Sequence, residues 1–372
     1  MQHIRRLAML SLCITHITPT FAAGRDFSTD ELLALSLEDL TQVQVSIATG
    51  TPKSSYSAPA VTSVIDAKTI ADLGLQSIDE ALQTLPNVHV SRGSFQYAPR
   101  YFIRGIASTY NPHTLVLVNG IPMTSLFLGD RGERIPNAYS LPIELVDRIE
   151  VIRGAGSALY GADAFAGVIN IHTKNPRDIK NNQASLTVGS FATGRANLLQ
   201  RQQWQDNSAL LSLNYYQSDG DSPIIQRDIQ SNYDELFQPY PAQSLAPAAA
   251  SLSARYFNAH LDLQAPNYRL RSAWLKAWNT GTGVGINDNL DPDARFNHHR
   301  ASFDLSWQGG HYLGWQLSPQ LSYLYGDYEN PSSIYLFPKG AFAGLFPDGM
   351  IGQPSVKEEN ARFHLSALTE QL

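Results

Sequence analysis

The chain has 372 residues, which is enough for two domains or for one domain and part of a larger one. Charged residues make up 16% and aromatic residues 10%, with 17 tyrosines, a balance that favours strands with one face toward lipid but also fits a soluble β-sandwich. The formal net charge of −6 argues against a nucleic-acid partner, which would require a basic face.

Residues 1–22 have the pattern of a cleaved secretion signal. Arg5 and Arg6 give a basic start, a short apolar stretch follows, and small residues precede a cleavage site after Ala22. Cys13 is the only cysteine and lies inside this segment, so the mature chain would have no disulfide and no thiolate metal ligand. Since no later apolar run is long enough to predict a transmembrane helix, we expect a periplasmic protein, a secreted protein or an outer-membrane barrel.

Residues 23–53 form a predicted N-terminal extension. Ser28 and Glu31 fit a capping box before a short amphipathic helix that ends near Leu40. Polar and apolar residues then alternate, as in an extended segment, over Val43, Gln44, Val45, Ser46, Ile47 and Ala48. A Thr-, Ser- and Pro-rich linker follows. This segment suits strand addition to a partner's sheet edge, although an ordinary edge strand of the next domain fits the pattern equally well.

Residues 54–176 have a compact pattern of strands and helices. The predicted helix runs from Ser77 to about Leu85. The predicted strands cover residues 61–65, 88–90, 101–103, 114–118, 149–152 and 168–172. An Asn-Gly pair at Gly120 follows an apolar strand and is a good hairpin signal. We therefore predict an α+β domain.

Residues 181–372 show strict alternation of apolar and polar residues over about eight segments. Predicted long connections at residues 218–253, 279–298 and 329–360 alternate with short ones at residues 204–207, near Pro266 and near Gly309, after a tight first turn at residues 192–194. Short turns at one end and long loops at the other are typical of an outer-membrane β-barrel, and a soluble sandwich has no reason for this asymmetry. We predict antiparallel transmembrane strands that form an incomplete β-barrel.

Three motifs with familiar spacing fail as active or cofactor sites. The glycine-rich residues 153–159 follow a strand, but the third glycine of a dinucleotide-binding fingerprint would fall at Leu159. The segment that ends at Gly161 has P-loop spacing but no lysine to meet a phosphate. His298 and His299 lie in a predicted long loop without further ligands at a matching spacing, so a solvated loop is the better interpretation. We expect no enzyme, no cofactor and no metal site.

The strongest signal is one long string, LPIELVDRIEVIRGAGSALYGADAFAGVINIHTK, at residues 141–174. Together with YFIRGI at residues 101–106 and LVLVNGIP at residues 115–122, it closely resembles the plug domain of TonB-dependent outer-membrane receptors. The resemblance covers nearly the whole predicted α+β domain and continues as architecture over the alternating strands. Two residues depart from the family pattern: Ala155 stands where the family usually has Pro, and His172 where it usually has Ile.

The resemblance implies a ligand-gated importer. In the family, the plug fills a barrel of about 22 strands. Outer loops and plug apices bind a scarce metal chelate or similar solute, and the inner-membrane TonB complex pulls on an N-terminal peptide, the TonB box. That peptide would map to residues 43–48, where strand addition would let main-chain hydrogen bonds bear load in parallel.

The resemblance also implies roles for particular plug residues. Arg104 and Arg153 resemble plug arginines that pair with barrel glutamates, because buried guanidinium groups need partners. The alternative is that each is a turn residue with a solvated head. The expected turn glycines are Gly105, Gly120, Gly154, Gly156 and Gly161.

We therefore expect a monomeric outer-membrane receptor for energy-coupled uptake of an iron chelate, in contact with the TonB complex and with membrane lipid. Cobalamin is the nearest rival solute. A receptor that binds without transport is a second class of function. A truncated, non-transporting fragment is a third, because about eight strands would leave two unpaired edges in lipid.

Overall fold

The computed structural model describes residues 44–45, 53–54, 61–92, 98–107, 111–123, 141–154, 156, 160–307, 310–331 and 333–369. These residues belong to one compact unit, Gln44–Leu372. The predicted secretion signal, the predicted helix before Leu40 and most of the predicted TonB box lie outside the described residues. Over the described ranges, no helix is long and apolar enough to cross a membrane.

The plug is built on a five-stranded sheet with the order β3-β8-β9-β6-β7. Its strands are β3 (Thr62–Asp66), β6 (Thr114–Val118), β7 (Ile121–Pro122), β8 (Val146–Arg153) and β9 (Gly167–Thr173). β6 and β9 run parallel, and the other neighbours run antiparallel. Two further antiparallel pairs join β4 (Val88–Arg92) to β5 (Pro99–Ile103) and β1 (Gln44–Val45) to β2 (Lys53–Ser54). The strands predicted for this domain are confirmed, with ends that differ by a few residues.

Two short capped helices pack against this sheet. In α3 (Ala67–Asp72), the Asp66 side chain accepts the Thr69 N–H at 2.7 Å. In α4 (Ile78–Gln83), the Ser77 hydroxyl accepts the Glu80 N–H, as expected for an N-cap. Two single turns of 3₁₀ helix, η1 (Ile143–Leu145) and η2 (Ala162–Ala164), flank β8 and β9. The helix predicted from Ser77 is therefore confirmed.

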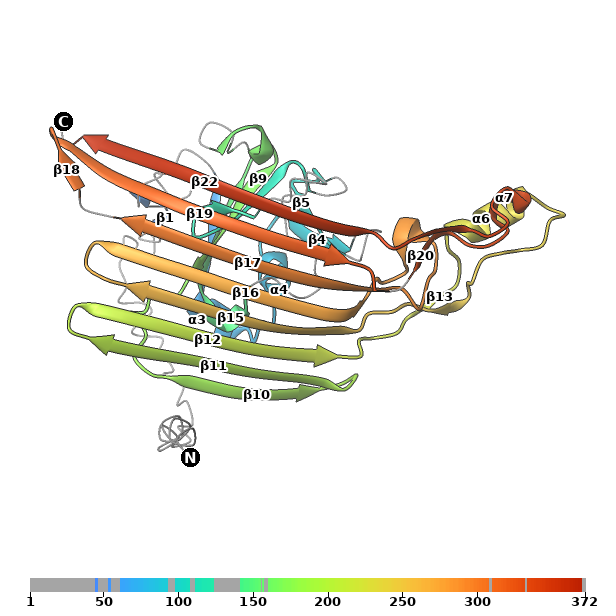
Figure 1. The fold of residues 1–372 in the computed structure, drawn as a ribbon, viewed down its shortest axis with the longest axis horizontal. Helices are drawn as coiled ribbons and strands as arrows, with labels where there is room; N and C mark the ends of the chain where they lie inside the picture. The colour runs from blue at the N-terminus through green and yellow to red at the C-terminus, as the bar shows by residue number, and fades with distance from the viewer. Residues whose placement is uncertain are drawn as a thin grey trace, which may run out of the picture. The chain divides into compact units, whose positions relative to one another are not determined.

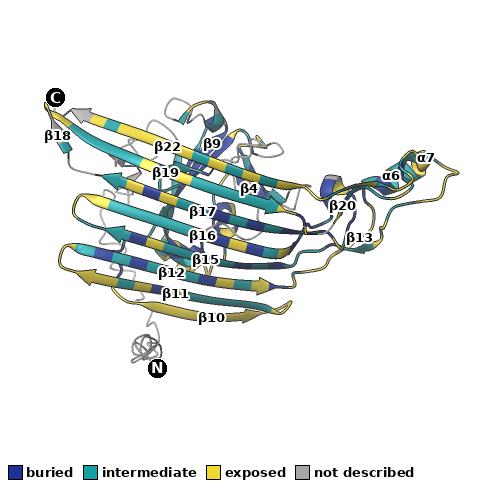
Figure 2. Cartoon of the chain, in the orientation of Figure 1, coloured by how far each residue is buried: buried dark blue, intermediate teal, exposed yellow. Residues whose placement is uncertain are grey.

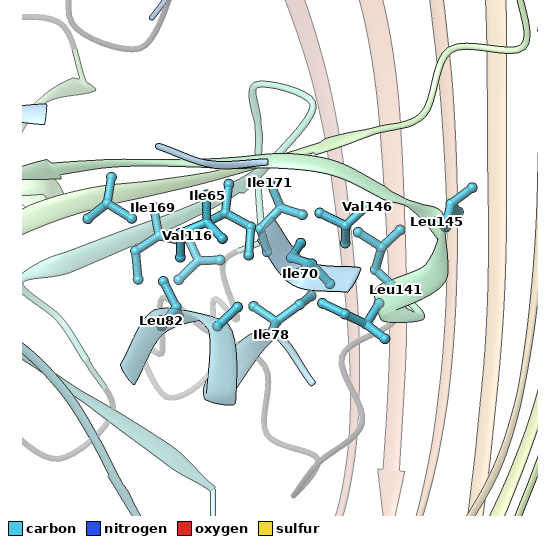
Figure 3. Packing of buried hydrophobic residues seen from close by; sticks show 14 of the residues in the cluster. Ile65, Ile70, Ile78, Leu82, Val116, Leu141, Leu145, Val146, Ile169 and Ile171 are labelled. Atoms are coloured by element: carbon cyan, nitrogen blue, oxygen red, sulfur yellow. The ribbon is translucent and has the colours of Figure 1, made fainter. Parts of the chain in front are cut away.

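The plug core lies between α4 and the sheet (Figure 3). Ile78 and Leu82 of α4 are 1% and 0% exposed and join the same cluster as Ile169 and Ile171 of β9. β9 is paired on both edges, and its first five residues are buried. Because β9 is covered on both faces, the polar Asn170 is buried together with the apolar Ile169 and Ile171.

Replacing Leu82 by alanine is expected to destabilise the plug by about 3 kcal/mol, because a fully buried side chain leaves a cavity when it is shortened. Thermal unfolding of the purified protein measures the effect. Gln83→Ala on the exposed face of the same helix is the matched control and is expected to change stability by less than about 0.5 kcal/mol. Equal effects of the two substitutions would contradict the placement of α4.

A second, nine-stranded sheet forms the barrel wall (Figure 1). Its strands are β10 (Gln183–Gly189), β11 (Thr193–Trp204), β12 (Asn207–Ser218), β15 (Ala254–Gln264), β16 (Tyr268–Gly281), β17 (Arg295–Trp307), β18 (Gly310–Tyr312), β19 (Trp315–Glu329) and β22 (Ser355–Thr369). Every pair in it is antiparallel, and β18 and β22 both pair with β19. Apart from the short β18, the eight long strands agree with the predicted number.

Burial alternates along the wall strands (Figure 2). In β12 the inward residues Ser208, Leu210, Ser212 and Asn214 are buried, and the residues between them are less buried. Leu199 and Leu210 of the wall belong to the plug's own hydrophobic cluster, so the inward face is the one that meets the plug. The period of two therefore separates a plug-facing side from an outward side.

The outward side is an apolar band between two groups of aromatic residues. The exposed band includes Leu198, Leu261, Phe303, Leu305, Leu321, Phe363 and Leu365. Beyond the band at one end lie Trp204, Tyr268 and Trp315, all more than one-third exposed. At the other end, Tyr215 pairs with Trp278 and Phe257 with Trp274, with ring centroids 6.3 and 5.7 Å apart. Such aromatic groups on either side of an apolar band mark the two surfaces of a membrane.

The connections at the two ends of the wall differ in length. At the turn end, the connections are residues 205–206, 265–267 and 313–314. At the loop end, they are residues 190–192, 219–253, 282–294 and 330–354. The predicted asymmetry is confirmed. The short connection predicted near Gly309 lies between β17 and β18 at residues 308–309, outside the described residues. A second tight turn, which was not predicted, lies at Leu313 and Gly314, with φ of 50° and 80°, between β18 and β19.

The long loops contain short elements of their own. These are β13 (Ile224–Ile225), α6 (Ile229–Leu236), β14 (Ala248–Ala249), η3 (Ile286–Asp288), β20 (Ile334–Phe337), α7 (Ala341–Gly344) and β21 (Met350–Gly352). The strand ends reach further into the loops than predicted, so the second and third long loops begin later and end earlier than expected.

Candidate functional site

The two predicted pairing arginines lie on neighbouring turns of the plug. Arg104 follows β5, is exposed, and has Nη1 3.3 Å from the position that a Cβ on Gly154 would occupy. Arg153 donates to the Pro86 carbonyl at 2.9 Å and to the Ser63 hydroxyl at 2.8 Å. Among the described residues, neither guanidinium pairs with a carboxylate of the wall. Their pairing with barrel glutamates therefore stays a prediction.

The predicted turn glycines lie around the same end of β8 and at the β6–β7 hairpin. Positive φ occurs at Gly105 (79°), Gly120 (80°), Gly154 (132°) and Gly161 (81°). Gly154 also lies beneath the Arg104 guanidinium, so a residue with a side chain at this position would be disfavoured both by the backbone conformation and by the available space. At Gly156 the requirement for glycine comes from lack of space and not from a positive φ, because a Cβ there would lie 2.6 Å from Val168 Cγ2.

Only Gln44 and Val45 of the predicted TonB box are described; Val43, Ser46, Ile47 and Ala48 lie outside the described residues. Gln44 pairs with Ser54 and Val45 with Lys53 in a two-stranded sheet. An isolated pair of such short strands is marginally stable in water. A partner strand that offered a longer ladder could therefore displace it.

A plug carboxylate, Glu144 of η1, meets the wall at β11. Glu144 Oε1 accepts a hydrogen bond from Asn197 Nδ2 at 2.7 Å and lies 3.4 Å from Arg195 Nη1. Arg195 also reaches Gln76 Oε1 of the plug at 3.3 Å. In this contact the acid lies on the plug and the arginine on the wall, and it is separate from the pairs predicted for the two plug arginines. We call these four residues the plug–wall seam.

The seam continues into a small polar cavity of about 20 Å³. Glu144 Oε2, Asn214 Oδ1 and both side-chain polar atoms of Asn258 are buried there without a hydrogen-bond partner in the described part of the chain. The cavity is large enough for one water molecule, which such groups can bind. Polar contacts of this kind exchange with water at low cost, whereas the apolar plug core does not. The seam is therefore the weaker boundary if the plug moves.

Further contacts connect the end of the plug to the turn end of the wall. Arg201 of β11 donates through Nε to the Pro176 carbonyl at 2.9 Å, and Arg177 donates to the Asp206 carbonyl at 3.1 Å. Both use main-chain oxygens, so they fix the exit of the chain from the plug without a buried carboxylate.

A buried carboxylate explains one departure from the family pattern. Glu150 of β8 is fully buried, and its Oε1 lies 2.8 Å from Arg148 Nε and 3.2 Å from His172 Nε2. His172 on β9 thus lies beside a buried carboxylate, with which an isoleucine could form no polar contact. The sequence showed the unusual histidine but not its partner on the neighbouring strand.

Inside the wall, charged side chains bridge neighbouring strands. Arg269 of β16 holds Asp262 of β15 through two nitrogens, with Nη2 2.6 Å from Oδ2. Arg271 of β16 pairs with Asp304 of β17 at 2.9 Å, and Gln320 of β19 donates to the same carboxylate at 2.6 Å. These cross-strand contacts were not predicted, because pairing partners between strands are not apparent from one sequence.

At the loop end, Asp228 joins two of the long loops. Its carboxylate accepts hydrogen bonds from Ser231 N at 2.8 Å, Ser244 Oγ at 2.6 Å and Leu290 N at 3.0 Å. Asp291 accepts from Tyr335 N at 3.0 Å and so ties in the third loop. The three loops therefore form one assembly, which we call the loop assembly.

An aromatic cluster closes the tip of the loop assembly, where α6 and α7 lie together (Figure 1). The cluster consists of Tyr233, Phe237, Phe337, Phe342 and Phe346. The closest ring centroids, those of Tyr233 and Phe342, are 4.5 Å apart. Tilted and edge-to-face pairs at such distances add stability beyond area burial. The packed aromatic rings thus give the loop assembly a defined surface at its tip.

The loop assembly is expected to loosen in acid. Burial raises the pKa of Asp228, but hydrogen bonds from Ser244, Leu290 and Ser231 outweigh it and hold the pKa below the ordinary 3.8. A lowered folded-state pKa gives stability that is present above the unfolded value and lost as the pH falls below it. Protection of the Leu290 amide against hydrogen exchange should therefore fall below about pH 4.

Asp228→Asn should reduce that protection about tenfold at neutral pH, because an amide has only one accepting oxygen and cannot accept from the two serines at one atom and from Leu290 at the other. Asp221→Asn, on the exposed part of the same loop, is the control and should leave protection unchanged. Unchanged protection in Asp228→Asn would rule out this carboxylate as the link between the loops.

The histidine pair does not lie in a loop. His298 and His299 belong to β17, with His298 buried and stacked on Tyr328 at 3.9 Å between ring centroids. His299 points outward and accepts a hydrogen bond from Trp274. The expected solvated loop is wrong here, because β17 extends past the apolar band into its polar end. In the part of the chain that the structure describes, no group of three or more His, Cys, Asp or Glu side chains could hold a metal ion.

Comparison with known proteins supports the same architecture. The family model described as the TonB-dependent Receptor Plug Domain matches residues 54–168. The iron-regulated outer membrane virulence protein of Vibrio cholerae is 30% identical over 288 residues, covering 72% of this chain and 40% of that protein. A vitamin B12 transporter of Vibrio vulnificus is 29% identical over 204 residues, covering 54% of this chain and 32% of that protein.

Among solved structures, the ferric enterobactin receptor of Pseudomonas aeruginosa, in complex with enterobactin, matches with a TM-score of 0.56 at 20% identity. The match covers 81% of this chain and 46% of that receptor. It shows a shared fold of plug and barrel wall. The chain spans less than half the length of these relatives.

Proposed function

Because this chain belongs to the TonB-dependent receptor family, we propose that it serves energy-coupled uptake of a scarce solute across the outer membrane. The observation that carries the proposal is the plug seated against the inner face of a barrel wall and joined to it by the seam around Glu144. A plug held partly by polar, exchangeable contacts and partly by apolar contacts at Leu199 and Leu210 can both close a pore and be displaced from it. The loop assembly offers the surface where a solute would first bind.

We propose an iron chelate, such as a ferric siderophore, as the solute. One relative is named as iron-regulated, and solved structures of the same fold are named as ferric siderophore receptors. Aromatic side chains gather at the tip of the loop assembly and would pack against the organic part of a chelate. Cobalamin is the alternative, supported by the relatives named as vitamin B12 transporters.

Energy would enter through the predicted TonB box at residues 43–48. The β1–β2 pair supports this placement, since Gln44 and Val45 are extended and paired through the main chain. In the same proposal Arg104 and Arg153 pair with barrel glutamates, residues 1–22 are a cleaved signal, and the receptor acts as a monomer in outer-membrane lipid. No cofactor takes part.

The proposal is tested in cells that lack their own siderophore and cobalamin receptors and carry this gene in full. Uptake of radiolabelled iron, supplied as a ferric siderophore, is compared with uptake of radiolabelled cobalamin. We expect receptor-dependent uptake of iron and none of cobalamin. Uptake of cobalamin alone would show that the solute is cobalamin and not an iron chelate. Uptake of neither would contradict the proposed function.

A further inference from the structure

A cavity of about 90 Å³ lies between the plug and the inner face of the wall. On the plug side it is bounded by the β6–β7 hairpin and by Lys174 after β9. On the wall side it is bounded by β15, β16, β17, β19 and β22, at positions such as Asp262, Arg271, Asp304 and Arg362. Asp262, Arg271 and Asp304 lie in the half of their strands that is nearer the turn end, and Arg362 lies at the middle of β22. The cavity therefore lies away from the loop assembly, where a solute would first bind.

Both carboxylates at this cavity are already neutralised. Asp262 is held by Arg269, with Nη2 2.6 Å from Oδ2 and Nε 3.0 Å from Oδ1. Asp304 is held by Arg271 at 2.9 Å and also accepts from Gln320 at 2.6 Å. Each of the two carboxylates that line the cavity is thus paired with a wall arginine, and neither has its charge free for a cation from the plug.

Two cations remain. Lys174 and Arg362 have no hydrogen-bond or ion-pair partner for their side-chain nitrogens among the described residues, and both line the cavity. Arg362 of β22 lies opposite the inward Ser322 of β19, so it is on the plug-facing side. Arg271, although its Nη2 pairs with Asp304, keeps a buried Nε without a hydrogen-bond partner among the described residues. The cavity therefore has an excess of positive charge and unsatisfied donors.

Burial disfavours the charged form of the Lys174 ammonium. Burial lowers its pKa from the usual 10.5, and the more distant charges of Asp147 and Glu144 only partly oppose the shift. A partly buried ammonium that lacks a close counter-ion is destabilised, and a bound anion would offset that cost. The cationic lining of the cavity and the position of Lys174 in it thus both favour a bound anion.

We propose that this cavity binds a carboxylate or phosphate group, held by Lys174 of the plug and by Arg362 and Arg271 of the wall. The size agrees with a group of this class, since one water needs about 10–15 Å³ by the same measure, and 90 Å³ is far too small for a whole siderophore. The anion is either a free small ion or an acidic group of a larger solute. Binding of the anion is independent of the proposed function, whereas a role as a second binding site along the import path rests on the proposed function.

The experiment uses the protein expressed from its complete gene and purified from outer membranes. Inorganic phosphate is the probe, and broadening of its phosphorus resonance reports binding; acetate is added as competitor. We expect saturable broadening that acetate reverses. Lys174→Gln should weaken phosphate binding at least about tenfold, because a charge-assisted hydrogen bond is lost. Lys174→Arg should restore it, which separates loss of charge from loss of folding.

The matched control is Lys276→Gln, which removes an exposed lysine from the outward side of β16 and should leave binding unchanged. Arg362→Gln is expected to weaken binding as Lys174→Gln does. No saturable binding by the unaltered protein, or equal binding by Lys174→Gln, would overturn the proposal. Iron uptake is measured separately in cells, so a protein that binds phosphate but imports no iron would fail as an importer and still confirm this site.

Discussion

Val45→Pro is expected to reduce import of the ferric siderophore to background while leaving its binding at the cell surface unchanged. Val45 pairs with Lys53 through the main chain in β1–β2, and strand addition by a partner would use the same main-chain groups. Proline has no N–H and cannot donate to such a ladder. In the proposed function the solute binds at the loop assembly, which this substitution does not touch. The initial rate of radiolabelled iron uptake and equilibrium binding in the cold measure the two effects.

Two controls define the result. Val45→Ala keeps the N–H and is expected to import at nearly the original rate. Ser57→Pro places a proline in the predicted linker, where no ladder is expected, and should also import. Import by Val45→Pro at the original rate would move the coupling peptide away from residues 43–48.

Asp304→Ala is expected to destabilise the barrel wall by about 3–5 kcal/mol. Asp304 is 4% exposed, pairs with Arg271 at 2.9 Å and accepts from Gln320 at 2.6 Å, so one carboxylate connects three strands. Its removal leaves the Arg271 guanidinium largely buried without a counter-ion, and an uncompensated charge costs more than the pair contributed. The temperature at which the purified protein unfolds measures the loss.

Asp327→Ala is the matched control for Asp304→Ala. Asp327 lies at the polar end of β19 and makes one long hydrogen bond to Tyr325 at 3.3 Å, so the change should stay within about 0.5 kcal/mol. Replacing Asp304 and Arg271 together by leucine should recover most of the stability, since no charge is left unpaired. A double variant as unstable as Asp304→Ala would show that the ion pair is not the cause.

Local sequence signals predicted the plug well. The Ser77 cap predicted α4, and the apolar runs predicted β6 and β9 within a residue or two, because caps and buried strands are encoded by neighbouring residues. The period of two predicted the wall for the same reason: each strand must separate an apolar face from a polar one.

Contacts between distant residues could not be predicted in this way. The seam joins Glu144 to Arg195 and Asn197 on another element, and no local signal in the sequence pointed to these partners. The turn at Leu313 and Gly314 was missed because Gly309 and Gly310 gave a stronger local signal. His298 and His299 were assigned to a loop because the polar ends of barrel strands have the composition of loops.

The most direct test of energy-coupled import is the initial rate of ferric siderophore uptake before and after a protonophore collapses the inner-membrane gradient. The cells carry this gene in full and no other receptor for the siderophore. We expect binding at the surface to persist and uptake to stop. Uptake that continues at the same rate without the gradient would contradict a plug that is moved by an energised partner.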